Sequence, residues 1–360
     1  MPRRKPDFFD LMDAWEGIGV VVHRDAPTGT WIFIALHDDA LGTPVGGCRM
    51  MVYPRPEDGL RDAMRLAEGM TYKWGAIELP FGGGKSVLAV PRPLEGEERR
   101  GLFRRFGALL NSLGGAYGTG EDLGTTPADM REIASVSEHV VCLHRGDDKA
   151  VDPGPFTAVG VLAGIKAALR HRFGSEKLKE RTVLIQGVGD VGEPLARLIS
   201  GEGGSVVLSD IDQDKAFSLA VELGGSTVTP EEVYDARCHV YAPCAVGGTL
   251  NRRTIPKLRC DIVAGSANNQ LERREDAELL KERWILYAPD YVINAGGAMA
   301  FGLMHQGERD IDVLFDRVRG IGDTLAAVFE RSAAEEVSPL EAADARVREV
   351  LERAGGTRTP

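Results

Sequence analysis

Two charged side chains in the first third of the chain lie in glycine-rich sequence. Lys85 follows the glycines at 82–84, and Asp122 lies between Gly120 and Gly124. Glycine carries no side chain, so a ligand can come close to the backbone there and reach the charged group beside it. The two stretches therefore predict a ligand site that contains a lysine ammonium group and an aspartate carboxylate.

Other interpretations of these stretches remain open at this stage. GGGKS resembles the end of a phosphate-binding loop, but the required first glycine would fall on Leu79, which excludes that motif. Lys85 could be an exposed lysine after a flexible turn. Asp122 could cap a turn or a helix, and Thr125 or Thr126 is expected to cap the helix that follows.

Helices and strands should position both groups. Periodicity predicts a helix over 57–73 that ends on Lys73, and further helices at FFDLMDAW, at 101–113 and at 156–172. Three strand-like runs precede the first long helix, and their Pro, Gly, Asp and Thr separators favour hairpin or meander turns. These runs are GVVVH, WIFIAL and VGGCRMMVY, and a short strand is expected after Lys85.

RTVLIQGVGDVGEPLARLISGEGGSVVLSD, residues 181–210, reads as strand, glycine turn, helix and strand. In G-x-G-x-x-G the first glycine makes a tight turn, the second admits a pyrophosphate and the third packs the helix on its strand. Asp210 at the tip of the second strand can accept hydrogen bonds from ribose hydroxyls and would repel a 2′-phosphate. The unit predicts an NAD site at Gly187, Val188, Gly189, Asp190, Val191, Gly192 and Asp210.

Three later apolar runs each end in small or polar residues: CHVYAPCAV, CDIVAGSANNQ and WILYAPDYVINAGG. The carboxyl ends of parallel strands line the ligand cleft of such a sheet, so Pro243, Asn268, Asn269 and Asn294 are expected there. Alternatively, the asparagines only hold their turns through local hydrogen bonds.

The order of these elements predicts an α/β fold of two domains, with a deep cleft between them. A boundary in GDDKAVDPGP separates a first domain, 1–150, from a Rossmann domain, 151–330. Two polar-faced helices over 311–354 complete the chain, and residues from about 330 to 360 could pack back on the first domain.

Composition narrows the partners. The chain has 360 residues and a net charge of -11, and the pI is about 5.3. This charge argues against nucleic acid or an anionic membrane as a partner. We see no secretory leader and no apolar run long enough to span a membrane, so we expect a cytoplasmic protein. The five cysteines lack C-x-x-C spacing, which favours buried free thiols, and no metal site is expected.

Seven ordered strings resemble the dehydrogenase family that acts on leucine, phenylalanine, valine and glutamate, and its leucine and phenylalanine branch most closely. The strings cover about residues 45–297. They are TYKWGAIELPFGGGKSV, GTGEDLGTTPADM, GPFTAVGVLAGIKAA, GVGDVG, APCAVGGTLN, AGSANNQL and YAPDYVINAGG. The resemblance implies a substrate-binding and oligomerisation domain followed by an NAD-binding domain, in a homo-oligomer.

The resemblance also implies roles for residues. Lys73, with Asn269, would bind the substrate carboxylate, Lys85 would activate water, and Asp122 would exchange protons with the amino group. Burial near the second cation would lower the pKa of Lys85 from its ordinary 10.4. Gly46 and Gly47 would approach the substrate through the backbone. Thr157, Pro243, Asn268 and Asn294 match the nicotinamide side of the family's cofactor site.

Four positions correspond to the family's side-chain pocket: Val45, Gly120, Ala298 and Phe301. The leucine branch tends to carry Leu, Ala, Val and Val there. Gly120 and Ala298 leave more room, and Phe301 could stack on an aromatic substrate. We therefore expect a bulky apolar L-amino acid, with phenylalanine or another aromatic ahead of leucine. Glutamate is disfavoured because none of these positions supplies a cation.

Two other functions compete with this expectation. A Rossmann dehydrogenase of 2-hydroxy acids usually needs a histidine acid–base, but His139 and His144 fall outside the glycine-rich motifs. An NAD-binding regulatory protein without turnover would need none of the three charged residues. The presence of Lys73, Lys85 and Asp122 together favours an enzyme that acts on an amino acid and its 2-oxo acid, with ammonia.

Overall fold

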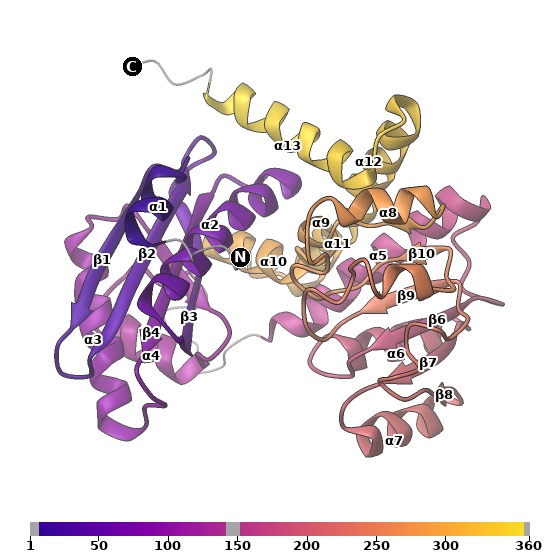
Figure 1. The fold of residues 1–360 in the computed structure, drawn as a ribbon, viewed down its shortest axis with the longest axis horizontal. Coiled ribbons are helices and arrows are strands. Elements are labelled where there is room, and N and C mark those ends of the chain that lie inside the picture. Colours follow the sequence, from indigo (N-terminus) through magenta and orange to yellow (C-terminus); the bar gives the residue numbers. More distant parts are fainter. Residues whose placement is uncertain (1–6, 142–151, 356–360) are drawn as a thin grey trace, which may run out of the picture. The chain divides into compact units, whose positions relative to one another are not determined.

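The structure is a computed structural model that describes residues 7–141 and 152–355. The chain divides into two compact units (Figure 1). Unit 1 comprises Met1–Val151 together with Glu349–Pro360, and unit 2 comprises Asp152–Arg348. Both units are α/β, which confirms the predicted fold class.

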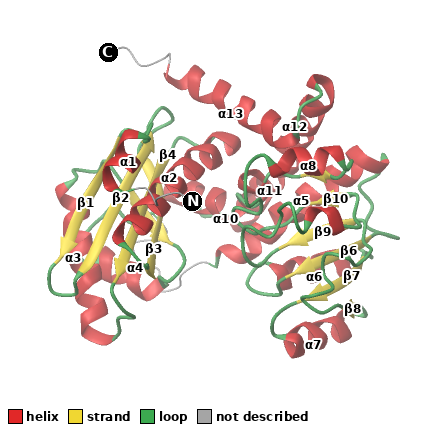
Figure 2. Cartoon of the chain, in the orientation of Figure 1, coloured by secondary structure: helices red, strands yellow, loops and turns green. Residues whose placement is uncertain are grey.

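Unit 1 is built on a five-stranded mixed sheet with the order β1-β2-β4-β3-β5 (Figure 2). β1 pairs antiparallel with β2 and β2 with β4, whereas β3 is parallel to both β4 and β5. The strands are β1 Gly19–Asp25, β2 Thr30–Asp38, β3 Pro44–Val52, β4 Gly82–Val90 and β5 Gly118–Glu121. Every residue of the central strand β4 is buried.

Helices cover both faces of this sheet. Val87 and Ala89 of β4 belong to a core that includes Leu60 and Ala63 of α2. The alternate residues of β4, such as Leu88, pack in a second core with α3 and α4. The helices are α1 Phe8–Asp13, α2 Pro56–Ile77, α3 Gly96–Ser112 and α4 Pro127–Ala134. Because side chains alternate along a strand, Lys85 faces α2.

The predicted hairpin or meander of the first three strands is wrong for the third. β1 and β2 form a hairpin, but β4 inserts between β2 and β3. After β3 the chain crosses over through α2, and a crossover of this kind returns the next strand parallel to the first. The local turn residues could not indicate this insertion, because it depends on where α2 packs.

The glycines before Lys85 are also not a loop. Residues 82–84 begin β4, and Lys85 lies inside this strand rather than ahead of it. A Cβ added at Gly83 would stand 1.9 Å from the Thr71 hydroxyl oxygen, and one at Gly84 would stand 2.8 Å from the ring of Tyr117. Packing against the protein itself therefore requires these glycines.

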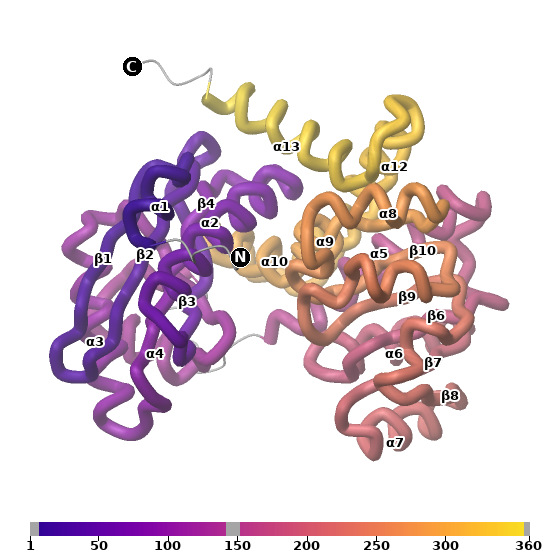
Figure 3. The backbone as a smooth tube through the Cα atoms, viewed as in Figure 1, coloured from indigo at the N-terminus to yellow at the C-terminus, as the bar shows by residue number. Residues whose placement is uncertain are grey.

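Unit 2 carries a six-stranded parallel sheet with the order β11-β10-β9-β6-β7-β8. Figure 3 traces the chain through β6 to β10 of this sheet. Counted from β6, this is the 3-2-1-4-5-6 order of dinucleotide-binding sheets. The strands are β6 Thr182–Gln186, β7 Ser205–Ser209, β8 Ser226–Thr227, β9 Val240–Pro243, β10 Ile262–Val263 and β11 Leu286–Tyr287. The strand order reverses between β6 and β9, which is where such sheets bind ligands.

The helices of unit 2 include α5 Pro153–Phe173, α6 Gly192–Gly201, α7 Gln213–Leu223, η1 Ile255–Lys257, α8 Asp276–Glu282, α9 Asp290–Ile293 and α10 Gly296–His305. The last segment forms three helices, not the predicted two: α11 Ile311–Arg319, α12 Ile321–Glu335 and α13 Pro339–Gly355. Gly320 separates the first two, and Glu336, with a φ of 55°, ends the second. Helical periodicity continues across Gly320, so the pattern alone does not reveal the break.

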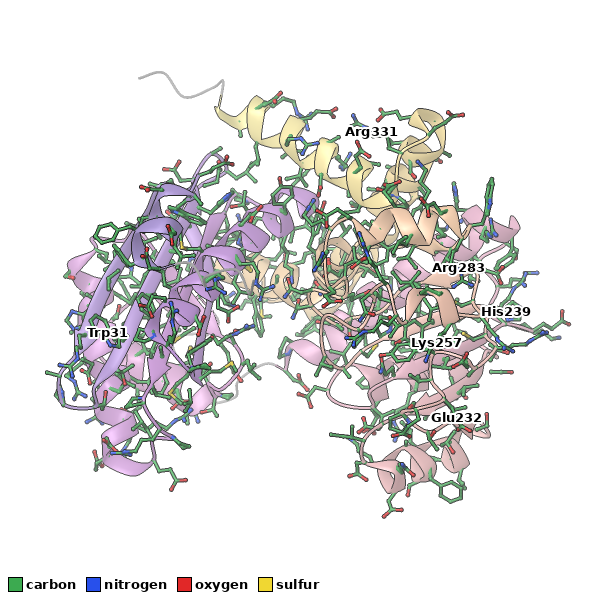
Figure 4. All side chains as sticks on the ribbon, in the orientation of Figure 1. Trp31, Glu232, His239, Lys257, Arg283 and Arg331 are labelled. Atoms are coloured by element: carbon green, nitrogen blue, oxygen red, sulfur yellow. The ribbon has the colours of Figure 1, made fainter. Side chains whose placement is uncertain are left out.

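Polar side chains also fix loops of unit 2 (Figure 4). Nδ1 of His239 accepts the Thr182 N–H at 2.9 Å, and Arg283 donates to the carbonyl of Leu258 at 3.0 Å. Across residues 7–141 and 152–355, none of the helices combines the length and the apolar character that a membrane crossing needs.

Cys48, Cys238, Cys244 and Cys260 are free thiols, of which Cys48 is buried and the others are partly buried. Cys142 and His144 lie outside the described residues.

Candidate functional site

Lys85 and Asp122 meet in unit 1. Lys85 is 5% exposed in the centre of β4, and its Nζ lies 3.2 Å from Oδ1 of Asp122. Asp122 follows directly after β5, and β3 lies between β5 and β4. The sheet order thus brings together two residues that are 37 positions apart in the sequence.

The carboxylate of Asp122 is not a helix cap. Its backbone N–H donates to the Thr125 hydroxyl at 3.0 Å, whereas Thr126 caps α4. Burial would raise the pKa of Asp122, but the charges and hydrogen bonds of Lys85 and Arg49 outweigh burial and hold the pKa below its ordinary value. Asp122 is therefore a carboxylate at neutral pH and can accept a proton.

Two further charged residues extend this contact and were missed in the sequence. Arg49 donates from Nε to Oδ2 of Asp122 at 2.8 Å and from Nη1 to Oδ2 of Asp62 at 2.9 Å. We call Lys85, Asp122, Arg49 and Asp62 the charged row. Arg49 stands two residues after Gly47, on the same face of β3, and this alternation was the available signal.

Gly47 makes room for the charged row. A Cβ at this position would lie 2.7 Å from Cβ of Asp122 and 3.0 Å from Nζ of Lys85. At Gly46 a Cβ would stand only 1.8 Å from the Gly84 carbonyl oxygen, so the neighbouring strand requires that glycine. Neighbouring protein atoms thus account for both glycines without a ligand.

Aromatic side chains hold the backbone of β3 beside these glycines. The Tyr117 hydroxyl donates to the carbonyl of Gly46 at 2.9 Å, and the indole N–H of Trp74 donates to the carbonyl of Val45 at 3.0 Å. Gly120 of β5 pairs in register with Gly47. The start of β3 is therefore fixed on both sides of the charged row.

Lys73 lies in the C-terminal half of α2 and is partly buried. It follows Asp62 by eleven residues, about three helical turns, so both residues project from the same side of α2. Unit 1 therefore places Lys73 on the helix that covers the charged row.

The glycine turn of unit 2 has the geometry of a nucleotide-binding turn. Gly187 has a φ of 97°, a conformation that favours glycine. The Val188 N–H donates to Oδ2 of Asp210 at 2.7 Å, and the Asp212 N–H donates to Oδ1 at 2.9 Å. Asp210 is thereby held at the tip of β7 beside the turn.

The residues of this turn fit a dinucleotide. A Cβ at Gly192 would stand 1.8 Å from the Gly187 carbonyl oxygen. A Cβ at Gly189 would have no heavy atom within 4 Å from any described residue other than its chain neighbours. Val191 is the N-cap residue of α6 and cannot cap the first amides with its side chain. Asp190 beside Gly189 is exposed. The start of α6 is therefore open to a phosphate group.

Asparagines meet beyond the ends of the later strands. Nδ2 of Asn294 donates to Oδ1 of Asn268 at 2.8 Å and to the carbonyl of Ser266 at 3.2 Å. Oδ1 of Asn294 is buried, and none of the residues in 7–141 and 152–355 supplies a hydrogen-bond donor to it. The asparagine pair thus holds the turn, as the simpler interpretation has it. Asn269 is exposed and has a φ of 52°.

The remaining residues of unit 2 that the sequence indicated for the cofactor site or the substrate pocket lie on α5, β9 and α10. Thr157 donates to the carbonyl of Pro153 at 2.9 Å and accepts the Gly297 N–H at 3.2 Å, so its hydroxyl already has protein partners. Pro243 is the last residue of β9. Ala298 and Phe301 lie one turn apart on α10 and are partly buried.

These arrangements define two kinds of chemistry. Unit 1 places an ionised carboxylate against a lysine ammonium and an arginine guanidinium, which suits proton exchange with a small charged substrate. Unit 2 presents an open helix start and a carboxylate at a strand tip, which suit a dinucleotide. Among the residues of both units that the structure describes, no cluster of potential metal ligands occurs.

Two family models match the chain. Residues 25–139 match the Glu/Leu/Phe/Val dehydrogenase dimerisation domain, and residues 208–311 match glutamate/leucine/phenylalanine/valine dehydrogenase.

Curated proteins and a solved structure are similar over nearly the whole chain. Leucine dehydrogenase of Thermoactinomyces intermedius is 37% identical over 355 residues, 98% of this chain and 95% of that protein. L-tryptophan dehydrogenase of Nostoc punctiforme is 40% identical over 311 residues, 86% of each chain. A crystal structure of L-tryptophan dehydrogenase from Nostoc punctiforme matches with a TM-score of 0.83 and 35% identity, covering 97% of this chain and all of that one.

Proposed function

Because the chain belongs to the Glu/Leu/Phe/Val dehydrogenase family and is therefore an amino-acid dehydrogenase, we propose that it catalyses NAD-dependent, reversible oxidative deamination. The substrate is a bulky apolar L-amino acid, and the products are its 2-oxo acid and ammonia. The observation that carries this proposal is the contact of Lys85 with the ionised Asp122 in unit 1.

Each charged residue has a step. Lys73 binds the substrate carboxylate, with Asn269 as a second donor. Asp122 takes a proton from the substrate ammonium. Lys85 acts in its uncharged amine form and takes a proton from the water that attacks the imine carbon, after which the C–N bond breaks and ammonia leaves. NAD⁺, when bound, supplies the acceptor for the hydride that leaves Cα. In the reverse direction Asp122 returns its proton to the amino group.

NAD rather than NADP is the proposed cofactor. Both oxygens of Asp210 accept one backbone N–H, which fixes the carboxylate while further lone pairs can accept ribose hydroxyls. A 2′-phosphate beside this carboxylate would be repelled. Gly189 and the start of α6 receive the pyrophosphate, and Asn268 and Asn294 serve the nicotinamide side. Thr157 and Pro243 are proposed to line the same nicotinamide side. The Thr157 hydroxyl already donates to the carbonyl of Pro153, so we assign it no hydrogen bond to the cofactor.

An aromatic amino acid is the proposed substrate, ahead of leucine. Gly120 and Ala298 carry little side chain, and Phe301 offers a ring to stack on. Val45 completes this set, and its backbone is fixed by Trp74. None of the four is cationic, so a substrate with an acidic side chain has no partner among them.

The units and the assembly follow from the same proposal. Unit 1 acts as the substrate-binding and oligomerisation domain, and unit 2 as the dinucleotide-binding domain of a cytoplasmic homo-oligomer. The small molecules are its proposed ligands, and its acidic charge of -11 supports the expectation that nucleic acid and membranes are not.

The test is NADH formation at 340 nm with NAD⁺ and a panel of L-amino acids. We expect turnover with phenylalanine or tryptophan to exceed turnover with leucine. In Lys85→Ala we expect a loss of about 10³-fold or more, because general acid–base groups contribute about 10²–10⁴-fold. Lys177→Ala, an exposed lysine of unit 2, is the control and should keep wild-type turnover.

Two results would contradict the proposal in different ways. A clear preference for leucine or valine would refute the aromatic substrate and keep the reaction. Tight NAD⁺ binding without turnover of any amino acid would instead support a regulatory protein on the same fold.

A further inference from the structure

Asp122 has a second neighbour that the proposed reaction does not use. Arg49 contacts no substrate in that scheme, yet its Nε lies 2.8 Å from Oδ2 of Asp122, closer than Lys85 lies to Oδ1. Its side chain is 13% exposed, so this contact is largely shielded from solvent. A guanidinium of this kind fixes the direction of a carboxylate as well as its charge.

Arg49 is itself held in place. Nη1 of Arg49 donates to Oδ2 of Asp62 on α2, at 2.9 Å. The same oxygen accepts the Tyr53 hydroxyl at 2.7 Å, and the other oxygen of Asp62 accepts from Arg65 at 2.8 Å. Asp62 therefore receives three donors from side chains and cannot turn without breaking several hydrogen bonds.

We propose that Arg49, anchored by Asp62, is a positioning residue that holds the Asp122 carboxylate in the orientation for proton exchange beside Lys85. This inference rests on the proposed amino-acid dehydrogenase activity and adds Arg49 and Asp62 to its machinery. One nitrogen of the guanidinium serves Asp122 and another serves Asp62, so a single planar group links the strand and the helix that flank the site. A lysine could reach one of these carboxylates but could not hold both in one plane.

The ionisable groups around Asp122 allow its titration to be followed. Burial raises the pKa of Cys48 to about 12 and raises the pKa values of Tyr53 and Tyr117, so these groups stay neutral in the working range. Burial would raise the pKa of Asp62, but hydrogen bonds from Arg65 and Tyr53 and the charge of Arg49 lower it. Other charged groups on the elements that pack there are Lys85 on β4, Glu121 on β5 and Asp129 on α4, the last of which pairs with Arg99. On α2 they are Glu57, Asp58, Arg61, Arg65, Glu68 and Lys73, and on α4 also Arg131 and Glu132.

The sign of the pH effect follows from the charges. Asp122 must be ionised to take the proton, so the rate falls on the acid side as pH drops through its pKa. Removal of Arg49 takes away one positive neighbour, which raises the pKa of Asp122 and moves the acid limb of kcat/KM to higher pH. We expect a shift of about one pH unit, since an adjacent arginine lowers a carboxyl pKa by about 1–3 units.

Three variants separate positioning from charge. Arg49→Gln should lower kcat by about tenfold to 100-fold and move the acid limb of the kcat/KM profile to higher pH. Arg49→Lys keeps the charge, so the acid limb should return towards the wild-type value while kcat stays low. Asp62→Asn leaves Arg49 charged but releases its anchor, so kcat should fall without an upward shift of the acid limb.

A matched control and a second readout complete the test. Arg105→Gln breaks another arginine–aspartate pair of unit 1, in which Arg105 Nε lies 2.5 Å from Asp25, and should leave the pH profile of kcat/KM in place. The ¹³C carboxyl titration of Asp122 in the protein without ligands, assigned with Asp122→Asn, should show the same upward pKa shift in Arg49→Gln. Circular dichroism melting identifies any variant that fails to fold.

The outcomes decide whether Arg49 and Asp62 position Asp122 for the reaction or have no part in it. An Arg49→Gln protein whose acid limb and Asp122 titration both match the wild type would overturn the inference, and so would Asp62→Asn with a wild-type kcat. If Arg49→Gln does not fold, Arg49→Lys and Asp62→Asn still decide. If the wild type turns over no amino acid, the proposed function fails, whereas the titration of Asp122 still measures the effect of Arg49.

Discussion

The charged row of unit 1 and the glycine turn of unit 2 both depend on glycine, but for opposite reasons. In unit 1, Gly47 is surrounded, and a Cβ there would meet Asp122 and Lys85 within 3.0 Å. In unit 2, Gly189 is exposed, and within the described part of the chain only its sequence neighbours come within 4 Å of a Cβ placed there. The first glycine leaves space for two charged side chains of the protein, and the second leaves space that the proposed dinucleotide would fill.

Charge follows the same division. Each carboxylate of the charged row already has cationic donors, so the side chains to which we assign the reaction are held in place by the protein itself. The turn of unit 2 instead presents the start of α6, whose N-cap residue Val191 cannot satisfy the first amides. In the function that we propose, the catalytic groups are thus fixed in advance, whereas the dinucleotide site leaves its hydrogen-bonding capacity for the ligand.

Gly47→Ala tests the crowded side of this comparison and should have the largest effect. The new methyl group would displace Asp122 or Lys85, and displacement of a catalytic group by about 1 Å can cost about 10²-fold in rate. We expect kcat to fall by about that factor while NAD⁺ affinity, measured by calorimetry, stays the same.

Gly69→Ala is the control, because Gly69 lies exposed on α2 with open space around its Cβ position. It should keep full activity and raise stability slightly, by about 0.5–1 kcal/mol. A Gly47→Ala protein with wild-type kcat would show that the charged row tolerates displacement.

Gly189→Ala tests the open side. Apart from its neighbours in the chain, no residue that the structure describes lies within 4 Å of the added methyl group, so we expect no loss of melting temperature in the free protein. If a pyrophosphate lies against this backbone, NAD⁺ affinity should fall by about tenfold, or about 1.4 kcal/mol.

The matched control is Gly201→Ala at the far end of α6, where the Cβ position is equally open. It should bind NAD⁺ like the wild type. Equal affinity in the Gly189→Ala protein would mean that the dinucleotide does not approach this glycine.

Asp210→Asn should have the smallest effect and sharpens the cofactor assignment. An amide oxygen can still accept the Val188 N–H, but the negative charge that opposes a 2′-phosphate is lost. We expect the ratio of kcat/KM for NAD⁺ over NADP⁺ to fall several-fold, in assays at one ionic strength.

Asp214→Asn removes a nearby exposed carboxylate in the first turn of α7 and controls for general charge. Its cofactor ratio should remain that of the wild type. An unchanged ratio in Asp210→Asn would instead assign cofactor choice to other residues.

The β-α-β unit with the glycine turn could be predicted from the sequence because its features are local. The strand, turn, helix and second strand of residues 181–210 lie in one continuous stretch, and each glycine has its own stereochemical reason. Only two of the four residues of the charged row could be predicted from the sequence. The glycines around Lys85 and Asp122 indicated these two residues in the sequence. Arg49 and Asp62 lie in ordinary strand and helix patterns, so the local sequence did not single them out.

By itself, the sequence determined the α/β class, the strand-and-helix alternation of unit 2 and the family, because periodicity and short motifs are properties of neighbouring residues. Only the tertiary structure decided that β4 inserts between β2 and β3, that Lys85 lies inside a strand, and that Arg49 joins Asp122 to Asp62. These features depend on which strands become neighbours. Strand order is set by packing between segments far apart in the chain, and no local pattern records it.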